Sequence, residues 1–250
     1  MNEKINNKKS WIVNPQILNI SDNDVHIWCV NVDQSEKSVE ILNEYLSEDE
    51  NNRKNNFYFE EDERRYAVTR GFLRSILGKY LKKDPGELQF TYSKRGKPEL
   101  KKNSNKELCF NLSHSNNLAL YAISFKQSIG VDIEYIQYQR DEDDVAKNFF
   151  SSREYNFISK LPEAQKVEAF YHIWTCKEAY LKATGVGLAG LKDVEVPEMI
   201  MTSVSKVKTD NVILDGWTMY RVPLPQHDYV ASLVVEGERR NCKFSLFSLI

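Results

Sequence analysis

Three carboxylates on two separate stretches of this 250-residue chain are the side chains best suited to chemistry. Asp132 and Glu134 stand in IGVDIEYI, and Glu178 stands in WTCKEAYLK. Because side chains alternate along a strand, Asp132 and Glu134 would share one face about 7 Å apart, close enough for one cation to bridge them. Oxygen ligands without His or Cys favour Mg²⁺, or Mn²⁺, over zinc. The sequence therefore indicates a divalent-metal site if the two stretches meet.

Each stretch taken alone also has a plainer interpretation. An exposed strand with an acidic outer face would explain Asp132 and Glu134. Glu178 and Lys182 have the i, i+4 spacing of an ion pair on a helix rim, which contributes roughly a few tenths of a kcal/mol. However, Glu178 falls on the apolar face of its helix, between Trp174 and Leu181. A carboxylate there is costly unless a cation, a metal or hydrogen bonds meet it.

Basic residues in the first half of the chain fit a polyanionic substrate. Residues 53–74 contain several arginines, the turn at 93–98 (SKRGKP) is basic, and His114 lies at a strand end in NLSHS. For any single arginine the alternative is a solvated face paired with the nearby acids of EEDE. Acids on one wall and cations on the other are typical of a phosphoryl-transfer site, where Mg²⁺ takes further ligands from substrate phosphates. The sequence has no GxxxxGK[ST] or GxGxxG loop, which argues against an ordinary nucleotide-binding fold.

The elements that must position these residues follow from hydrophobic periodicity and turn signals. Helices are predicted at residues 37–46, 60–81, 144–151, 152–160 and 161–184. Strands are predicted at residues 25–32, 88–92, 108–112, 118–124, 129–136, 194–196, 212–222, 229–235 and 243–249. Pro162 suits the first turn of the last helix, and Gly185 suits its C-terminal end.

Each half of the chain therefore combines one long amphipathic helix with several strands. We expect an α+β fold of two similar lobes with pseudo-two-fold symmetry, each an antiparallel sheet packed on a long helix. The predicted divisions are an N-terminal extension (1–24), a first lobe with the basic residues (25–128), a second lobe with the acidic site (129–237) and a C-terminal tail (238–250). The short linker between the lobes predicts that they pack closely and share a cleft.

The composition is that of a soluble globular protein, with 34 Lys+Arg against 36 Asp+Glu and a net charge of −2. This balance does not indicate wholesale nucleic-acid binding. The four cysteines form no CxxC pair, which argues against a zinc site and a disulfide framework. The N-terminus has no apolar segment behind its charges, and no apolar run of 18 residues occurs. We therefore expect a cytoplasmic monomer with no membrane or nucleic-acid partner.

Two of these motifs together resemble a known family. GVDIE (130–134), followed by WTCKEAYLK (174–182), is similar to the paired signature of the 4′-phosphopantetheinyl transferases. The resemblance is closest to the larger, two-lobed class typified by the surfactin synthetase activating enzyme, and it covers roughly residues 25–235. Further segments that match in the family's order are residues 57–77, the turn RGKPEL (95–100), NLSHS (111–115) and FFSSREY (149–155).

The resemblance implies the transfer of the phosphopantetheine arm of coenzyme A to a serine of an apo acyl or peptidyl carrier protein, with release of 3′,5′-ADP. It implies that Asp132, Glu134 and Glu178 hold Mg²⁺, with Glu178, Lys182 and Asp132 as catalytic residues. The residues that it implies for coenzyme A binding are Arg53, Arg65, Lys97, Ser113, His114, Lys177 and Lys182. Close relatives carry a further basic residue near Glu50, so the phosphate contact is expected to be weaker there or to come from Lys54.

Alternatives exist both for the group that accepts the serine proton and for the activity of the protein. The carrier serine has three candidate bases: Glu178, a metal-bound water and Lys182. We favour a water held by Glu178, because a glutamate that ligates a metal is usually too acidic to be a strong base. A second hypothesis is another coenzyme A-dependent acyl transfer with His114 as base. A third is a non-catalytic module that binds nucleic acid through the arginines of residues 53–74.

Overall fold

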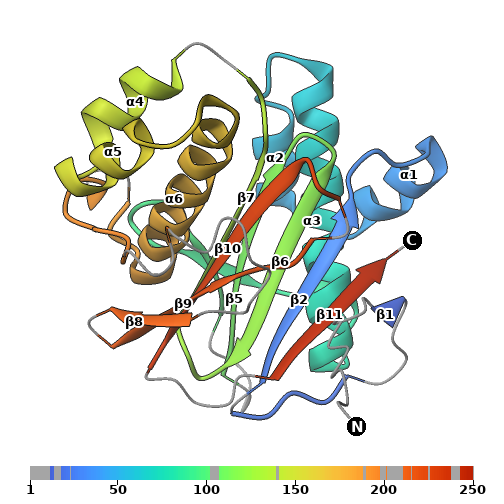
Figure 1. Cartoon of the computed structure of the whole chain (residues 1–250). Helices are drawn as coiled ribbons and strands as arrows, with labels where there is room; N and C mark the ends of the chain where they lie inside the picture. The colour runs from blue at the N-terminus through green and yellow to red at the C-terminus, as the bar shows by residue number, and fades with distance from the viewer. Residues whose placement is uncertain are drawn as a thin grey trace, which may run out of the picture.

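The computed structural model has two lobes, each with helices on one face of a sheet (Figure 1). It describes residues 12–13, 18–22, 24–101, 107–138, 141–187, 190–197, 201, 211–214, 216–224, 226–237 and 243–249. The predicted α+β, two-lobed fold class is confirmed.

The sheet of the first lobe has five strands in the order β1-β11-β2-β6-β5. Their bounds are β1 Ile12–Val13, β2 Asp24–Asn31, β5 Leu108–Ser115, β6 Leu118–Phe125 and β11 Lys243–Leu249. The strands β2, β6 and β5 pair antiparallel, whereas β11 pairs parallel with β2, and β1 pairs parallel with β11. The predicted extension (1–24) and tail (238–250) thus each supply a strand to this lobe. Periodicity indicates that residues 243–249 form a strand, but it carries no information on a partner some 200 residues away.

The helical layer of the first lobe is dominated by α3. The bounds are α1 Glu36–Glu44, α2 Glu48–Lys54, α3 Glu60–Leu81, the short 3-10 helix η1 Pro85–Glu87, and the separate hairpin β3 Phe90–Tyr92 with β4 Pro98–Leu100. The predicted helix over residues 60–81 is confirmed. Val68, Leu73 and Leu77 of α3 pack in one buried cluster with Trp28 and Ile123 of the sheet.

The second lobe has an antiparallel sheet of four strands in the order β7-β10-β9-β8. The bounds are β7 Ile129–Tyr135, β8 Asn211–Leu214, β9 Trp217–Arg221, β10 Tyr229–Glu236, α4 Glu142–Phe149, α5 Ser152–Ser159 and α6 Glu163–Thr184. Helix α6 ends as predicted at Gly185, which takes the left-handed conformation with φ +73° and donates its N–H to the Leu181 carbonyl. No helix in the described part of the chain is long and apolar enough to span a membrane.

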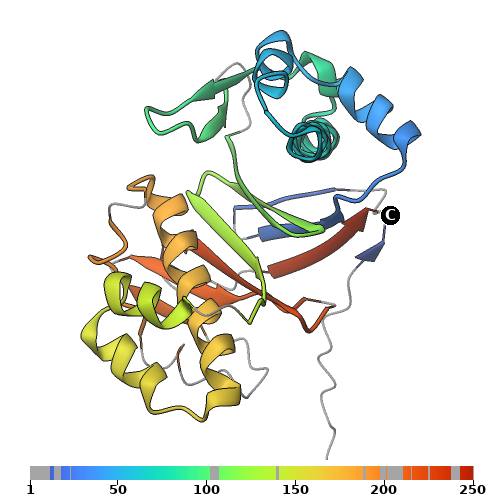
Figure 2. The ribbon, with the colours of Figure 1, turned by 90° about the horizontal axis from the view of Figure 1, so that it is seen from above.

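The two sheets pack face to face between the two helical layers (Figure 2). Ile27 and Leu120 of the first sheet share a buried cluster with Val131, Ile133 and Leu233 of the second. Within this packing, strand β7 lies between β5 of the first lobe and α6 of its own lobe. This position brings the acidic residues of β7 next to both elements.

The predicted strand at residues 194–196 is wrong. Backbone groups of this segment form hydrogen bonds with buried side chains instead of with a neighbouring strand. The Val194 carbonyl accepts from Lys177 Nζ, and the Val196 N–H donates to Glu154 Oε1. The predicted strand at residues 212–222 is divided into β8 and β9 by a turn at Gly216, whose φ is +83°. Both differences arise from contacts that a period-two pattern does not encode.

Strand β7 approaches α6 so closely that only glycine fits at position 130. A Cβ on Gly130 would lie 2.0 Å from the Ala179 carbonyl oxygen and 2.5 Å from the Ala183 nitrogen, both backbone atoms of α6. We expect Gly130→Ala to lower the free energy of unfolding by about 1–3 kcal/mol or more, because the backbones of β7 and α6 must separate. The separation would also move Asp132 relative to Glu178 and slow catalysis.

Urea unfolding and a rate assay check this expectation, with Gly86→Ala as the matched control. The nearest atom to a Cβ on Gly86 is the Asp84 side-chain oxygen at 3.2 Å. Equal stability of the two variants would contradict the close packing of β7 on α6.

Candidate active site

One pocket contains the three predicted carboxylates. Its volume is about 470 Å³, and its lining residues are Leu112, Ser113, His114, Asp132, Glu134, Trp174, Glu178 and Lys182. Asp132 and Glu134 come from β7, Glu178 and Lys182 from α6, and Ser113 and His114 from β5. The structure therefore brings together residues from three elements and from both lobes.

Asp132 is at the centre of the polar contacts in this pocket. Its residue exposure is 2%, and its Oδ1 atom accepts from Lys182 Nζ at 2.6 Å and from Ser113 Oγ at 2.8 Å. Lys182 Nζ also donates to Ser113 Oγ at 2.9 Å. The ammonium of Lys182 thus neutralises Asp132, the most buried of the three carboxylates.

Two carboxylate oxygens remain buried without a hydrogen bond. Neither Asp132 Oδ2 nor Glu178 Oε1 has a hydrogen-bond partner among the described residues. Such groups are costly to bury unless a cation or donor completes the site. The unpaired oxygens and the all-oxygen donor set fit a hard divalent cation. As the side chains stand, no three His, Cys, Asp or Glu residues within the described ranges already form a metal-binding group.

The pKa values in the pocket indicate an excess of negative charge. Burial raises the pKa of Glu134 to about 7, with the neighbouring Asp132 carboxylate adding to the rise. Burial, and then repulsion by Asp132, raises the pKa of Glu178. Burial also raises the pKa of Asp132, although Lys182 opposes the shift. One ammonium therefore faces three carboxylates whose ionised forms are poorly solvated, and a dication would relieve this imbalance.

Strand β5 of the first lobe holds the acidic strand of the second lobe. Asn111 Oδ1 accepts a backbone N–H of β7 at 2.9 Å, Ser113 donates to Asp132, and Ser115 Oγ donates to Glu134 Oε2 at 2.8 Å. The sequence prediction includes Ser113 but not Asn111 or Ser115. The signal is the alternation in NLSHS, which places positions 111, 113 and 115 on one strand face.

Of the predicted basic residues His114, Arg65 and Arg53 of the first lobe, only His114 lines the pocket. His114 is exposed on one side, and its pKa is lowered by burial and then by the Arg65 and Lys182 cations. Arg65 lies on α3 and pairs with Glu61 at 2.9 Å. Arg53 is exposed on α2. Arg65 and Arg53 do not line the pocket, although the Arg65 cation acts on the pKa of His114, which does.

The β3–β4 turn lies against the C-terminal end of α6. Lys97 Nζ donates to the Lys182 carbonyl at 2.6 Å, and Arg95 donates to the Gly185 carbonyl at 3.2 Å. Cations are favourable there because the last carbonyls of a helix lack intrahelical partners. An adjoining pocket of about 280 Å³ is lined by this turn together with Glu178 and Lys182. Lys97 therefore lies beside the carboxylate pocket, and burial lowers its pKa.

Lys177 does not reach either pocket. Its side chain is 0% exposed, pairs with Glu154 at 2.9 Å and donates to the Leu191 carbonyl at 3.0 Å and to the Val194 carbonyl. Neighbouring positions of a helix point about 100° apart, so Glu178 faces the pocket while Lys177 faces the interior of the lobe. Lys177 therefore anchors the segment after α6, and the structure separates it from the other predicted binding residues.

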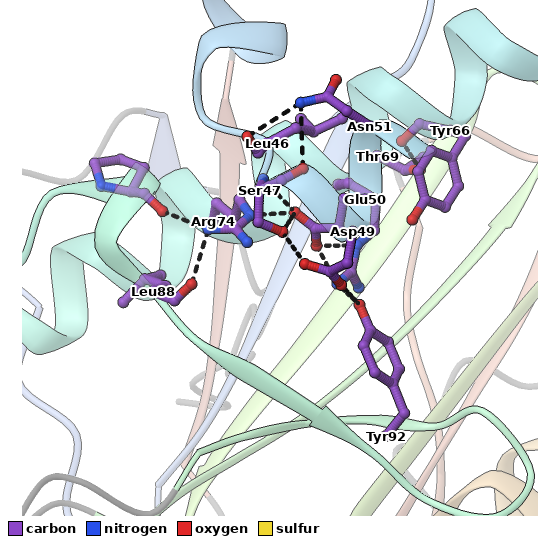
Figure 3. A network of polar contacts seen from close by, with 12 residues as sticks. Leu46, Ser47, Asp49, Glu50, Asn51, Tyr66, Thr69, Arg74, Leu88 and Tyr92 are labelled. Atoms are coloured by element: carbon purple, nitrogen blue, oxygen red, sulfur yellow. Dashed lines mark hydrogen bonds and ion pairs between the residues drawn. The ribbon is translucent and has the colours of Figure 1, made fainter. Parts of the chain in front are cut away.

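Glu50 is buried in a polar network of the first lobe and does not face the pocket (Figure 3). Its Oε1 accepts from Arg70 Nε at 2.8 Å, and its Oε2 accepts from Arg74 Nε at 2.5 Å. Arg74 also donates to the Pro85 and Leu88 carbonyls at 2.9 and 3.0 Å. The solvated arginine face considered for α3 is therefore wrong for these two arginines, which are buried and paired with Glu50. Lys54 is partly buried, 4.0 Å from Glu63.

Comparisons with known proteins agree with this arrangement. A family model described as the 4′-phosphopantetheinyl transferase superfamily matches residues 128–234, and one described as the N-terminal part of a 4′-phosphopantetheinyl transferase matches residues 32–126. The 4′-phosphopantetheinyl transferase HetI of Nostoc sp. is 42% identical over 229 residues, which are 91% of this chain and 94% of that protein. The 4′-phosphopantetheinyl transferase Sfp of Bacillus subtilis is 29% identical over 155 residues, 62% of this chain and 67% of that protein. The chain therefore belongs to the 4′-phosphopantetheinyl transferase superfamily and is a transferase of that family.

Proposed function

We propose that this protein transfers the 4′-phosphopantetheine group of coenzyme A to a serine hydroxyl of an apo acyl or peptidyl carrier protein. In this reaction the serine oxygen bonds to the β-phosphorus, the bond from that phosphorus to the bridging oxygen breaks, and 3′,5′-ADP leaves. The observation that carries the proposal is that Asp132 and Glu178, from different elements, line one pocket and each have a buried oxygen without a hydrogen bond among the described residues. We further propose that it acts as a cytoplasmic monomer without nucleic-acid or membrane partners.

We assign the binding of Mg²⁺, for which Mn²⁺ would substitute, to Asp132, Glu134 and Glu178. When bound, the ion neutralises charge on the diphosphate of coenzyme A and on the leaving group. Support comes from the oxygen-only donor set and from the raised pKa values, because carboxylates that burial and mutual repulsion destabilise gain most from a divalent cation.

The cations around the pocket would bind the phosphates of coenzyme A. Lys182, whose ammonium already lies in the pocket, is assigned to the diphosphate, and Ser113 offers a hydroxyl beside it. His114 has a lowered pKa and at neutral pH donates a hydrogen bond as an uncharged ring. We assign Arg65, Arg53 and Lys97 to the remaining phosphate contacts. Lys177 is left out of the set because its contacts are all with buried groups of the second lobe.

The serine proton must pass to a group in the pocket as the new bond forms. Glu178 Oε1, one of the two buried carboxylate oxygens in the pocket without a hydrogen bond among the described residues, can hold a water or accept the proton. Because a glutamate that ligates a metal is usually a weak base, Glu178 is assigned to hold a water and not to take the proton itself. Lys182, paired with Asp132 as an ammonium, is a poorer acceptor. We therefore assign proton transfer to Glu178 acting through a water.

The two rival hypotheses are less well supported. An acyl transfer with His114 as base does not require three carboxylates in the same pocket. A nucleic-acid module would require the arginines of residues 53–74 at the surface, whereas Arg70 and Arg74 are buried against Glu50. The pocket therefore favours the phosphopantetheine transfer.

Mass spectrometry of carrier proteins tests the proposed function. Purified enzyme, Mg²⁺ and coenzyme A should add one phosphopantetheine mass to at least one apo carrier from a panel that covers fatty-acid, polyketide and peptide synthesis. A chelator should abolish the gain. No gain on any carrier would contradict the proposal. An acyl transfer that is retained in Asp132→Ala and lost in His114→Ala, with no phosphopantetheine gain on any carrier, would favour the acyltransferase alternative.

A further inference from the structure

Ser115, at the end of β5, makes two hydrogen bonds of defined direction. Its Oγ accepts the Tyr135 backbone N–H at 3.0 Å and lies 2.8 Å from Glu134 Oε2. The Tyr135 N–H can only donate, so the Ser115 hydroxyl accepts from it and donates its own proton to Glu134 Oε2. The backbone of β7 thus fixes the rotamer of Ser115, and Ser115 in turn fixes one oxygen of Glu134.

The contact crosses from one lobe to the other. Ser115 belongs to the sheet of the first lobe and Glu134 to that of the second, and these two strands are not paired in a ladder. Ser113 Oγ makes the equivalent contact to Asp132 Oδ1, two residues earlier on each of the two strands. Hydroxyls at alternate positions of β5 therefore orient alternate carboxylates of β7.

Glu134 needs this contact more than Asp132 does. Asp132 is also held by the Lys182 ammonium at 2.6 Å, whereas the only hydrogen bond found for the Glu134 carboxylate within the described residues comes from Ser115. Glu134 is half-buried next to the like charge of Asp132. Without the hydroxyl, repulsion by Asp132 would favour rotamers that carry the Glu134 carboxylate away from the pocket.

We propose that Ser115 is a positioning residue that holds Glu134 ready to bind the divalent cation, so that the first lobe completes the metal site of the second. This inference rests on the proposed function, because it assigns Glu134 to the cation. Hydrogen bonds to metal ligands typically change metal affinity by about 10–100-fold. The alternative is that Ser115 only joins the lobes, in which case its loss would affect stability alone.

Four proteins separate the two roles: the wild type, Ser115→Ala, Ser115→Thr and the control Ser124→Ala. Ser124 is a buried serine on the adjacent strand β6, and its Oγ donates to the Gln127 carbonyl at 2.6 Å. Ser124→Ala loses one hydroxyl hydrogen bond and Ser115→Ala loses two, each worth about 1 kcal/mol. Only Ser115→Ala releases a proposed metal ligand. Threonine retains the hydroxyl and should restore the wild-type behaviour.

The measurement is Mn²⁺ binding in the presence of coenzyme A, followed by electron paramagnetic resonance, with thermal unfolding in parallel. We expect Ser115→Ala to weaken Mn²⁺ binding by about 10–100-fold, and Ser115→Thr and Ser124→Ala to bind as the wild type does. Equal Mn²⁺ affinity in Ser115→Ala and Ser124→Ala would overturn the inference while leaving the proposed function intact. A wild type that neither binds Mn²⁺ nor transfers phosphopantetheine would overturn both.

A further variant, Ser115→Cys, is needed if Ser115→Ala unfolds at a lower temperature than Ser124→Ala. Cysteine is close to serine in size, but its thiol is a much weaker hydrogen-bond donor than the serine hydroxyl. The same weakening of Mn²⁺ binding is then expected at wild-type stability. Wild-type affinity in Ser115→Cys would contradict the positioning role.

Discussion

Replacing Glu178 with glutamine is expected to slow phosphopantetheine transfer by about 10²–10⁴-fold while leaving the fold at least as stable as the wild type. The rate falls because the variant loses the carboxylate proposed to hold the proton-accepting water, which is also a proposed metal ligand. Stability is retained because burial and Asp132 raise the pKa of Glu178, which means that its ionised form is disfavoured in the folded protein. Loss of activity without loss of stability is the signature of a catalytic residue.

Glu168→Gln is the matched control for Glu178→Gln. Both residues lie on α6, but Glu168 pairs with Arg221 at 3.0 Å and does not line the pocket. Loss of this partly exposed ion pair should cost about 0–1 kcal/mol and leave the rate unchanged. Single-turnover mass spectrometry and metal-free thermal unfolding make the comparison. A Glu178→Gln enzyme as fast as Glu168→Gln would rule out the assigned role.

Replacing Glu50 with alanine is expected to lower the free energy of unfolding by about 3–5 kcal/mol. The carboxylate is fully buried and pairs with the guanidinium groups of both Arg70 and Arg74, so its removal leaves two buried cations without their acidic partner. The loss would also loosen α2, whose capping box includes Glu50. Urea unfolding measures the change.

Asp49→Ala controls for a change of charge on α2. Asp49 is exposed, and its contact with the Tyr92 hydroxyl is 3.5 Å long. Its removal should cost at most about 1 kcal/mol. If Glu50→Ala were no less stable than Asp49→Ala, the buried network would not contribute to stability. The structure also explains why an acid is tolerated where relatives were expected to carry a base: the side chain at position 50 points into the lobe.

Local periodicity predicts the elements of the site because local geometry alone determines which side chains share a face. The alternation in GVDIE places Asp132 and Glu134 together, and the helix around Glu178 spans Glu163–Thr184, close to the predicted residues 161–184. The presence of all three carboxylates in one pocket follows from the packing of β7 on α6. The resemblance to the family predicts this meeting, but periodicity does not.

Charged residues show where sequence reasoning fails. Lys177 and Lys182 belong to the same motif, yet Lys177 is buried and Lys182 lines the pocket. Lys177 faces the interior of the lobe, where Glu154, which is distant in sequence, pairs with it. Because a charge pattern does not reveal which acid meets which base, burial decides whether a cation contacts substrate or supports the fold.

The two lobes share a capping-box glutamate that pairs with buried cations, and the sequence pattern of the capping box reveals its position in each lobe. Glu50 and Glu154 both stand at the third helical position of a capping box, after Ser47 and Ser151, and both pair with buried cations of the long helix in their own lobe. The pattern Ser-x-x-Glu thus marks a corresponding acid in each half of the chain. This correspondence accords with the pseudo-two-fold relation between the lobes.

The most direct test of the central claim is the anomalous difference density of Mn²⁺ in crystals grown with coenzyme A. The account predicts one strong peak ligated by carboxylate oxygens of Asp132, Glu134 and Glu178, with the diphosphate of coenzyme A against it. A diphosphate bound elsewhere, or a peak that contacts neither β7 nor α6, would contradict it.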